Sequence, residues 1–263
     1  MAVKIHPTAI VDSNAKLGDG TEVGAYSIIG PKVVMGENCW IGNHVNVTGN
    51  TTIGNNCKIY HFASIGECPQ DKKYAGEDTK LIIGNNNTIR EYCSFNPGTV
   101  QGHGQTVVGD NNWIMAYVHI AHDCIVGNNT ILANGVTLAG HVTIKDWAIL
   151  GGLCPVHQFC VIGEHVMIGG QTGVAQDIPP YVMASSGTGG IRAEPKGVNT
   201  EGLKRRGFTV EQIDNTKQAY KMLYRNGLSY SEAKDFIEQL AEEHKELKPF
   251  VTFFAESTRG IIR

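Results

Sequence analysis

Large apolar residues recur at every sixth position along most of the first two thirds of the chain. The series occupies residues 5–65, 83–95 and 108–174, and every member is Ile, Val, Leu, Met or Phe. A period of six fits neither the 3.6-residue period of a helix nor the two-residue alternation of an ordinary strand. It is typical of the hexapeptide repeat of a parallel β-helix, in which short strands alternate with tight corners.

The repeat also predicts how the coils stack. Three hexads complete one triangular coil, so residues 18 apart in an uninterrupted stretch are expected on neighbouring rungs, about 4.8 Å apart. The apolar member of each hexad should point inward, and the glycine that follows it in many hexads allows the chain to turn. We therefore expect a mainly β fold, with a parallel β-helix over residues 1–184.

Two stretches break the repeat, at residues 66–82 and 96–107. Each is expected to leave the coil as an extruded loop, and such insertions often line the working face of a solenoid. Counted in hexads, the two breaks and His122 are separated by multiples of three. The two loops and His122 should therefore share one corner of the prism.

The pattern changes in the last part of the chain, over residues 185–263. The segment SSGTGGIRAEPKG is expected to form a loop or linker. Thr209 with Gln212, and Ser229 with Glu232, have the spacing of a capping box, which marks the start of a helix. Apolar residues follow each box at helical spacing, and a third helix is expected near the C-terminus. The sequence thus predicts a small C-terminal helical domain.

The composition narrows the class of protein. A net charge of -3 argues against nucleic-acid binding, which normally needs a basic excess. No apolar run approaches the roughly 20 residues of a membrane-spanning helix. The seven cysteines include no CxxC pair, which favours reduced thiols and a cytoplasmic location.

Histidines are the strongest candidates for chemistry. Three successive hexads of the predicted corner carry one each, namely His122, His141 and His157, and we expect them on one face of adjacent rungs. His119 precedes the first of these hexads and could join them. Histidine titrates near neutral pH and serves as a general base or as a zinc ligand. The residues alone leave both a base and a metal site open.

Three neighbours of His122 bear on that choice. Asp123 is adjacent in sequence, but neighbours on a strand face opposite ways, so its contact with His122 stays open. Gly140 lies 18 residues beyond His122, and its N–H could stabilise the oxyanion of an acyl transfer. Cys124 has no nearby feature that would lower its pKa, so we expect a buried, inert thiol.

Six motifs together resemble the UDP-N-acetylglucosamine acyltransferase family, which starts lipid A synthesis. They are HIAHDC, LAGHV, VHQFC, GGQTGVAQDIPPY, QDKKYAGE and GVNTEGLKRRGF. The resemblance runs nearly end to end and implies a left-handed coil. It implies transfer of a (3R)-3-hydroxyacyl chain from acyl carrier protein to the 3-hydroxyl of UDP-N-acetylglucosamine. It also implies a homotrimer with sites between subunits, and neither a cofactor nor a metal.

The same resemblance assigns roles to residues. It makes His122 the general base, Asp123 the acid that supports it, and Gly140 the oxyanion donor. It places Gly170 and Met167 where the length of the acyl chain is limited. The substrate contacts that it implies are Gln70, Asp71, Lys73, His119, His141, His157, Gln158, Asn199, Glu201, Arg205 and Arg206.

Two further functions are compatible with parts of the pattern. Some members of this family act on a sugar that carries an amine at position 3, which would give an amide product. A metal-dependent hydratase with this fold would explain the histidines, but it would leave the two loops and the pair Arg205 and Arg206 unexplained. A pair of guanidinium groups suits a diphosphate, since each group can donate two hydrogen bonds to phosphate oxygens at once.

Overall fold

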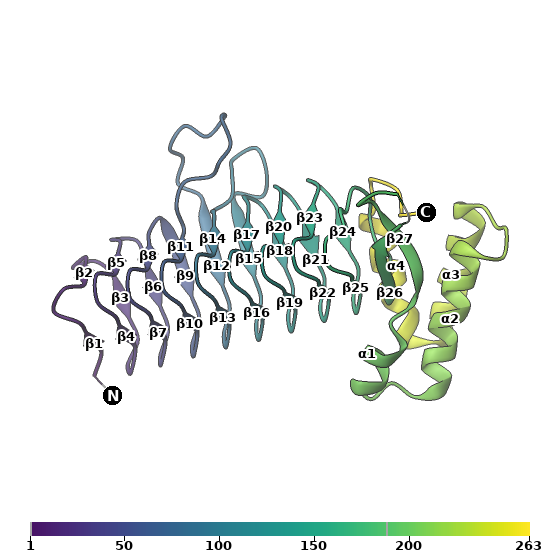
Figure 1. The fold of residues 1–263 in the computed structure, drawn as a ribbon, viewed down its shortest axis with the longest axis horizontal. Helices are drawn as coiled ribbons and strands as arrows, with labels where there is room; N and C mark the ends of the chain where they lie inside the picture. The colour runs from purple at the N-terminus through teal and green to yellow at the C-terminus, as the bar shows by residue number, and fades with distance from the viewer. Residues whose placement is uncertain (1, 188) are drawn as a thin grey trace.

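A computed structural model describes residues 2–187 and 189–263 and shows a long coil that ends in a group of helices (Figure 1). The coil is built from three parallel sheets, which we call A, B and C. Sheet A contains β1 (Lys4–Ile5), β4 (Glu22–Val23), β7 (Trp40–Ile41), β10 (Lys58–Ile59), β13 (Thr88–Ile89), β16 (Trp113–Ile114), β19 (Ile131–Leu132), β22 (Ile149–Leu150), β25 (Met167–Ile168), β26 (Val182–Ser186) and β27 (Ala193–Val198).

The other two sheets have eight strands each. Sheet B contains β2 (Ile10–Val11), β5 (Ile28–Ile29), β8 (Asn46–Val47), β11 (Ser64–Ile65), β14 (Ser94–Phe95), β17 (His119–Ile120), β20 (Thr137–Leu138) and β23 (Pro155–Val156). Sheet C contains β3 (Lys16–Leu17), β6 (Val34–Met35), β9 (Asn50–Ile53), β12 (Lys80–Ile83), β15 (Gln105–Val108), β18 (Ile125–Val126), β21 (Thr143–Ile144) and β24 (Val161–Ile162).

The predicted stacking rule is confirmed by the strand register. Within an uninterrupted stretch, residues 18 apart pair directly, as His119 does with Thr137. Across the two breaks the pairs are Ser64 with Ser94, and Ser94 with His119. Each insertion therefore lengthens one coil without changing the register of the next.

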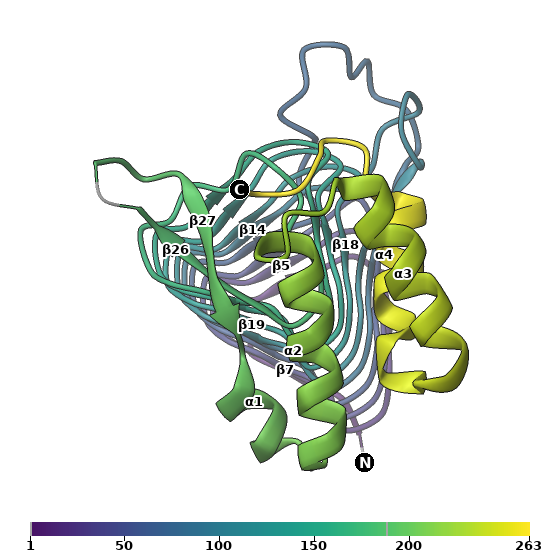
Figure 2. The same cartoon turned by 90° about the vertical axis from the view of Figure 1, so that its right-hand side faces the viewer.

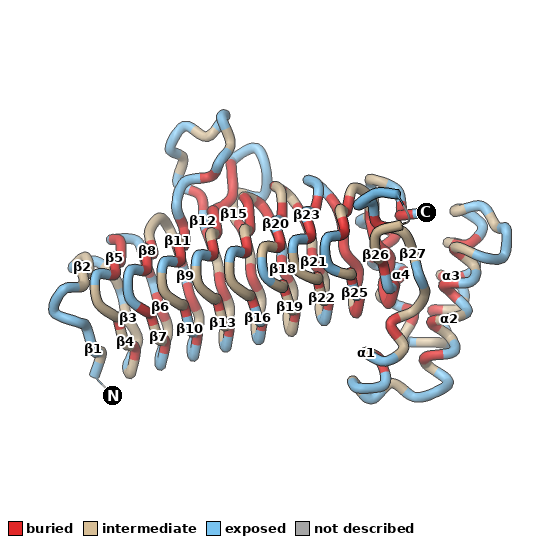
Figure 3. The backbone as a smooth tube through the Cα atoms, in the orientation of Figure 1, coloured by how far each residue is buried: buried red, intermediate tan, exposed pale blue. Residues whose placement is uncertain are grey.

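The apolar member of each hexad is the last residue of its strand, from β1 to β25, and most are fully buried (Figure 3). Fully burying one aliphatic side chain contributes about 1.5–3 kcal/mol, so the stacked column is the main source of stability. The exception is the N-terminal edge, where Ile5 is 47% exposed. Ile5 lies on the first coil, which has no coil beneath it.

Both loops leave the coil between sheets B and C, at the corner that also holds His122 (Figure 1). This confirms the shared corner, but the loops are shorter than expected. β12 begins at Lys80 and β15 at Gln105, so the loops span only 66–79 and 96–104. The extra residues are strand because they pair with each other and with β9 along sheet C.

The segment expected to be a loop at 185–197 contains the end of β26 and most of β27, which form a β-hairpin, and the residues described between these strands are not strand. β26 pairs in parallel with β25 and antiparallel with β27, so the hairpin extends sheet A. An open end of a parallel solenoid exposes unpaired backbone N–H and C=O groups. The hairpin covers that edge of sheet A, which explains why Val182–Ser186 is extended here.

The helices follow the hairpin and lie at the end of the coil (Figure 2). Both predicted capping boxes are present, at Thr209 and at Ser229. No helix in the described part of the chain is long and apolar enough to cross a membrane. The elements are α1 (Thr200–Arg205), α2 (Val210–Tyr224), α3 (Tyr230–Glu243), the short 3-10 helix η1 (Lys245–Leu247) and α4 (Lys248–Glu256).

Candidate active site

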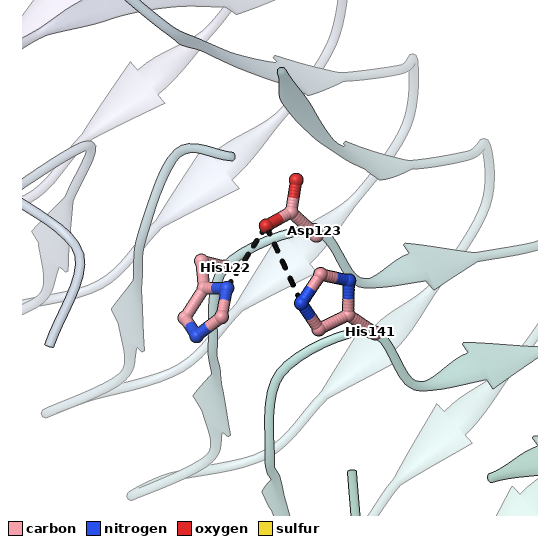
Figure 4. Close-up of side chains that lie close together, drawn as sticks. All are labelled: His122, Asp123 and His141. Atoms are coloured by element: carbon pink, nitrogen blue, oxygen red, sulfur yellow. Dashed lines mark hydrogen bonds and ion pairs between the residues drawn. The ribbon is translucent and has the colours of Figure 1, made fainter. Parts of the chain in front are cut away.

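His122 and Asp123 form a hydrogen-bonded pair at the corner between β17 and β18. The Nδ1 atom of His122 lies 2.9 Å from Oδ2 of Asp123 (Figure 4). Asp123 has a φ of 60°, the left-handed conformation that turns the corner. Because the chain bends here, the two side chains do not face opposite ways as strand neighbours do. The contact that the sequence left open is therefore made.

His141 lies one rung further along and faces the same carboxylate (Figure 4). Its Nε2 atom is 3.9 Å from Oδ2 of Asp123, and its ring meets that of His122 edge to face. Phe159 stacks on the His141 ring, with ring centroids 4.5 Å apart. Burial lowers the pKa of His141, although Asp123 acts in the opposite direction. His141 is thus neutral near pH 7 and can exchange hydrogen bonds with a bound hydroxyl.

The Asp123 carboxylate is inaccessible to solvent and heavily hydrogen-bonded. Burial raises its pKa, but hydrogen bonds from Thr99, His122 and His103 outweigh that effect, so its pKa lies below the ordinary value. Asp123 is therefore ionised at neutral pH. An ionised carboxylate on Nδ1 leaves Nε2 of His122 as the basic nitrogen and stabilises the imidazolium that forms.

Gly140 lies against the His122 ring from the next rung. A Cβ atom at this position would lie 2.5 Å from Cε1 and 2.7 Å from Nε2 of His122. Only glycine leaves the ring where it is. Within the described residues, the Gly140 N–H donates to no acceptor, so it is free to bind an oxyanion next to the base.

The other two histidines occupy different surroundings. The Nδ1 atom of His119 is 2.7 Å from the Ser94 hydroxyl oxygen, and burial lowers the pKa of His119. His157 is exposed and lines an apolar groove of about 390 Å³ on sheet B. The three histidines therefore lie at the expected corner on adjacent rungs, but they do not share one set of contacts. His122 and His141 meet at Asp123, whereas His157 faces the groove and Gln158 is exposed beside it.

The first loop brings polar groups toward this corner. Asp71 accepts a hydrogen bond from the Lys73 N–H at 2.9 Å, and its charge is close enough to His141 to favour the protonated ring. Gln70 and Lys73 are exposed. The side chain of Asn96 donates to backbone carbonyls of the first loop, so the two loops are joined at their bases.

The predicted nucleotide-binding residues gather around α1, at the corner between sheets C and A. Asn199 is buried, caps α1 and donates to the carbonyl of His165. Arg206 lies over the ring of Trp147, 5.0 Å from its centroid, and donates to the Trp147 carbonyl. Glu201 pairs with the exposed Lys204.

These residues, together with the exposed Arg205, lie at a different corner from His122. Two corners of one prism are separated by the width of a whole sheet. The structure therefore does not bring the α1 group to the histidine site of the same chain.

His165 holds Arg206 and gives a pH-dependent prediction. Burial, followed by the Arg206 charge, lowers the pKa of His165 from 6.5 to about 4. Because the folded protein keeps His165 neutral, the free energy of unfolding is highest above pH 6.5, where this histidine is neutral in the unfolded chain too. The free energy of unfolding falls as the pH drops toward 4, since the unfolded chain then binds a proton that the fold does not. The loss is on the order of 3 kcal/mol.

The prediction can be measured by urea unfolding of the wild type and His165→Phe between pH 7 and pH 4. Phenylalanine suits this corner because Phe159 already occupies an equivalent left-handed position. The stability of the variant should vary less with pH than that of the wild type. Equal pH dependence in the two proteins would contradict the assignment.

The two residues expected at the end of the acyl chain separate in the structure. Gly170 lines a cavity of about 600 Å³ at the corner between sheets A and B, together with Tyr117, Gly135 and Leu153. Met167 points outward from β25 and does not line this cavity. Within one chain, Gly170 therefore lines this cavity and Met167 does not.

The expected inert thiol is found. Cys124 is buried, and its thiol donates to the carbonyl of Ala139 at 3.1 Å. Burial raises the pKa of Cys124 to about 12. A thiol that stays protonated at neutral pH is a poor nucleophile.

Comparison with known proteins identifies the chain. Residues 32–67 and 105–140 match the family described as bacterial transferase hexapeptide (six repeats). Residues 177–262 match the second domain of UDP-N-acetylglucosamine O-acyltransferase. An acyl-(acyl-carrier-protein)–UDP-N-acetylglucosamine O-acyltransferase from Thiobacillus denitrificans is 55% identical over 98% of this chain and 99% of its own length. The chain belongs to this acyltransferase family.

Two further relatives of the acyltransferase family agree. The enzyme of the same name from Herminiimonas arsenicoxydans is also 55% identical, over 98% of this chain and 99% of its own. The crystal structure of UDP-N-acetylglucosamine acyltransferase from Francisella novicida superposes with a TM-score of 0.96 at 46% identity, covering 98% of this chain and 94% of that one. The fold is accordingly the left-handed parallel β-helix of these acyltransferases, followed by C-terminal helices.

The metal alternative has a definite location in this acyltransferase site. His122, Asp123 and His141 each offer one ligand atom, and these atoms lie within 4.8 Å of one another. The choice between base and metal is open to a chelator experiment.

Sequence reasoning missed several residues of this acyltransferase site. They are Thr99 and His103 in the second loop, Ser94 on the strand below His119, and Phe159 on His141. The counted repeat stops at the second loop, so no spacing rule predicts which loop atoms reach Asp123. Phe159 could have been found, because it is 18 residues beyond His141.

Proposed function

We propose that the chain transfers a (3R)-3-hydroxyacyl chain from acyl carrier protein to the 3-hydroxyl of UDP-N-acetylglucosamine, the first step of lipid A biosynthesis. The observation that carries the proposal is the His122–Asp123 pair, which leaves Nε2 as a base beside an unused Gly140 N–H. The two relatives at 55% identity are named for a transfer of this type.

His122 acts as the general base in this proposal. Its Nε2 takes the proton of the sugar 3-hydroxyl as that oxygen attacks the thioester carbonyl, and the Gly140 N–H binds the oxyanion. The intermediate collapses as the C–S bond breaks, and the imidazolium returns its proton to the sulfur of the carrier. The products are an ester and a free carrier thiol, so protons and electrons balance without a cofactor.

We propose that the remaining polar residues bind the substrates. Gln70, Asp71 and Lys73 would contact the sugar nucleotide from the first loop, and His119, His141, His157 and Gln158 would line the path to the base. The α1 residues Asn199, Glu201, Arg205 and Arg206 would bind the uridine diphosphate. Because the α1 residues lie at another corner of their own chain, they would serve the site of a neighbour in a homotrimer. The proposed reaction would take place in the cytoplasm, which supplies both substrates.

The proposal is tested by mass spectrometry of the product. Acceptors are UDP-N-acetylglucosamine and its 3-amino analogue, and donors are a 3-hydroxyacyl carrier protein and the matching coenzyme A thioester. We expect an ester product from the carrier protein and the hydroxyl acceptor. Preference for the amine would assign the amide-forming reaction instead, and the coenzyme A donor working as well would remove the carrier protein from the account.

Gly170 gives a prediction about the donor. Replacing it with methionine should shift the preferred acyl chain to a shorter length, since the new side chain would occupy part of the 600 Å³ cavity. Turnover with the wild type's best donor is expected to fall about tenfold or more, as one or two lost methylene contacts contribute about 1–3 kcal/mol. Competition between carrier proteins of several lengths measures the shift. The control is Val34→Ala, which removes an exposed side chain on β6 away from this cavity and should leave the preference unchanged.

A further inference from the structure

The second loop surrounds the Asp123 carboxylate with hydrogen-bond donors. The Thr99 N–H reaches both carboxylate oxygens at 3.1 Å, and the Thr99 hydroxyl donates to Oδ2 at 2.7 Å. The His103 N–H donates to Oδ1 at 2.8 Å. One loop thus supplies three donor groups to one carboxylate, and Thr99 provides two of them.

The loop is built to lie directly on this carboxylate. The N–H groups of Gly102 and Gly104 both donate to the Thr99 carbonyl, which closes the loop on itself. A Cβ atom on Gly102 would lie 2.3 Å from Cγ of Asp123, so the loop backbone is in contact with the carboxyl group. From the other side, Asp123 donates its own N–H to the Thr106 hydroxyl. The loop thus holds the carboxylate of Asp123, and Thr106 on β15 holds its backbone.

Two histidines compete for the same carboxylate oxygen. His122 is bonded to Oδ2 at 2.9 Å, while Nε2 of His141 is only 3.9 Å from that atom. A modest rotation of the Asp123 side chain would exchange one partner for the other. The Thr99 hydroxyl donates to the same oxygen as His122 does, so it favours the rotamer that serves His122.

We infer that Thr99 is a positioning residue, which holds Oδ2 of Asp123 on Nδ1 of His122 and so keeps Nε2 of His122 aimed at the acceptor hydroxyl. The inference rests on the proposed function for its kinetic consequence. Thr99 is only 1% exposed, and its side chain donates a hydrogen bond to Asp123. The second loop therefore has a role at the site that the hexapeptide repeat does not explain. Thr99 need not touch the substrate.

The test compares Thr99→Val, which keeps the shape and removes the hydroxyl, with Thr99→Ser, which keeps the hydroxyl. We expect valine to lower kcat about tenfold to a hundredfold, with KM changed less than about threefold, because a hydrogen bond to a charged group is lost. Serine should restore kcat to within about threefold of the wild type. The exposed Thr52→Val on β9 is the matched control and should behave as the wild type.

A readout without substrate separates this inference from the proposed function. The proton on Nδ1 of His122 should give a downfield resonance in proton NMR of the wild type and of Thr99→Ser, and it should be weakened or shifted in Thr99→Val. If the wild type transfers no acyl chain, the proposed function fails while this resonance still tests Thr99. An unchanged resonance with unchanged kcat in Thr99→Val would overturn the inference, and so would equal losses in the valine and serine variants.

Discussion

Replacing His122 with alanine should lower kcat for acyl transfer by about a thousandfold, the middle of the range for loss of a general base. In the proposed mechanism Nε2 of His122 takes the proton of the acceptor, and its Nδ1 is already bonded to Asp123 at 2.9 Å. KM should change little, because the ring acts on proton transfer in the transition state and contributes little to substrate binding. Initial rates over a range of acceptor concentrations give both constants.

The control for this variant is His6→Ala, which removes an exposed histidine at the opposite end of the coil. Thermal unfolding of both variants should match the wild type within a few degrees, since neither His122 nor His6 belongs to the buried apolar column. Turnover of His122→Ala within tenfold of the wild type, with the fold intact, would remove His122 from the role of base.

Replacing Gly140 with alanine should lower kcat about a hundredfold without removing any catalytic side chain. The added methyl group would lie 2.5 Å from Cε1 of His122, so the ring has to move. The backbone cannot relieve the clash easily, because the His141 N–H donates to the His122 carbonyl and ties the two corners together. A displacement of about 1 Å at a catalytic group can cost on the order of a hundredfold in rate.

The matched control is Gly190→Ala, where an added Cβ meets no atom within 4 Å. That variant should keep the wild-type rate. A crystal structure of Gly140→Ala should show the His122 ring turned away from Asp123. A variant that keeps full activity, with the ring in place, would contradict the steric account of this glycine.

Most of the coil could be predicted because its period is set by local geometry. One inward aliphatic residue and one tight corner recur every six positions, and the register then follows by counting. The hairpin of β26 and β27 could not be predicted, since its strands are extended by pairing with the edge strand β25 and with each other. The loop ends were misjudged at Lys80 and Gln105 for the same reason.

The site could be predicted in part. The shared corner followed from the hexad count, and the importance of Gly140 followed from its distance of 18 residues from His122. The left-handed corner at Asp123 recurs with the hexads, but the loop donors that hold its carboxylate lie in a loop of irregular length and have no spacing signal. His157 was grouped with the other histidines because a hexad count finds the rung but not the position within the corner.

The central claim is that His122 acts as a metal-free base in acyl transfer to UDP-N-acetylglucosamine. The most direct measurement is a time course of labelled UDP-N-acetylglucosamine with 3-hydroxyacyl carrier proteins of several lengths, using chelator-treated wild type and His122→Ala. The account predicts undiminished ester formation by the treated wild type and almost none by the variant. Activity that disappears with the chelator and returns with zinc would contradict it, as would an absence of product with every donor.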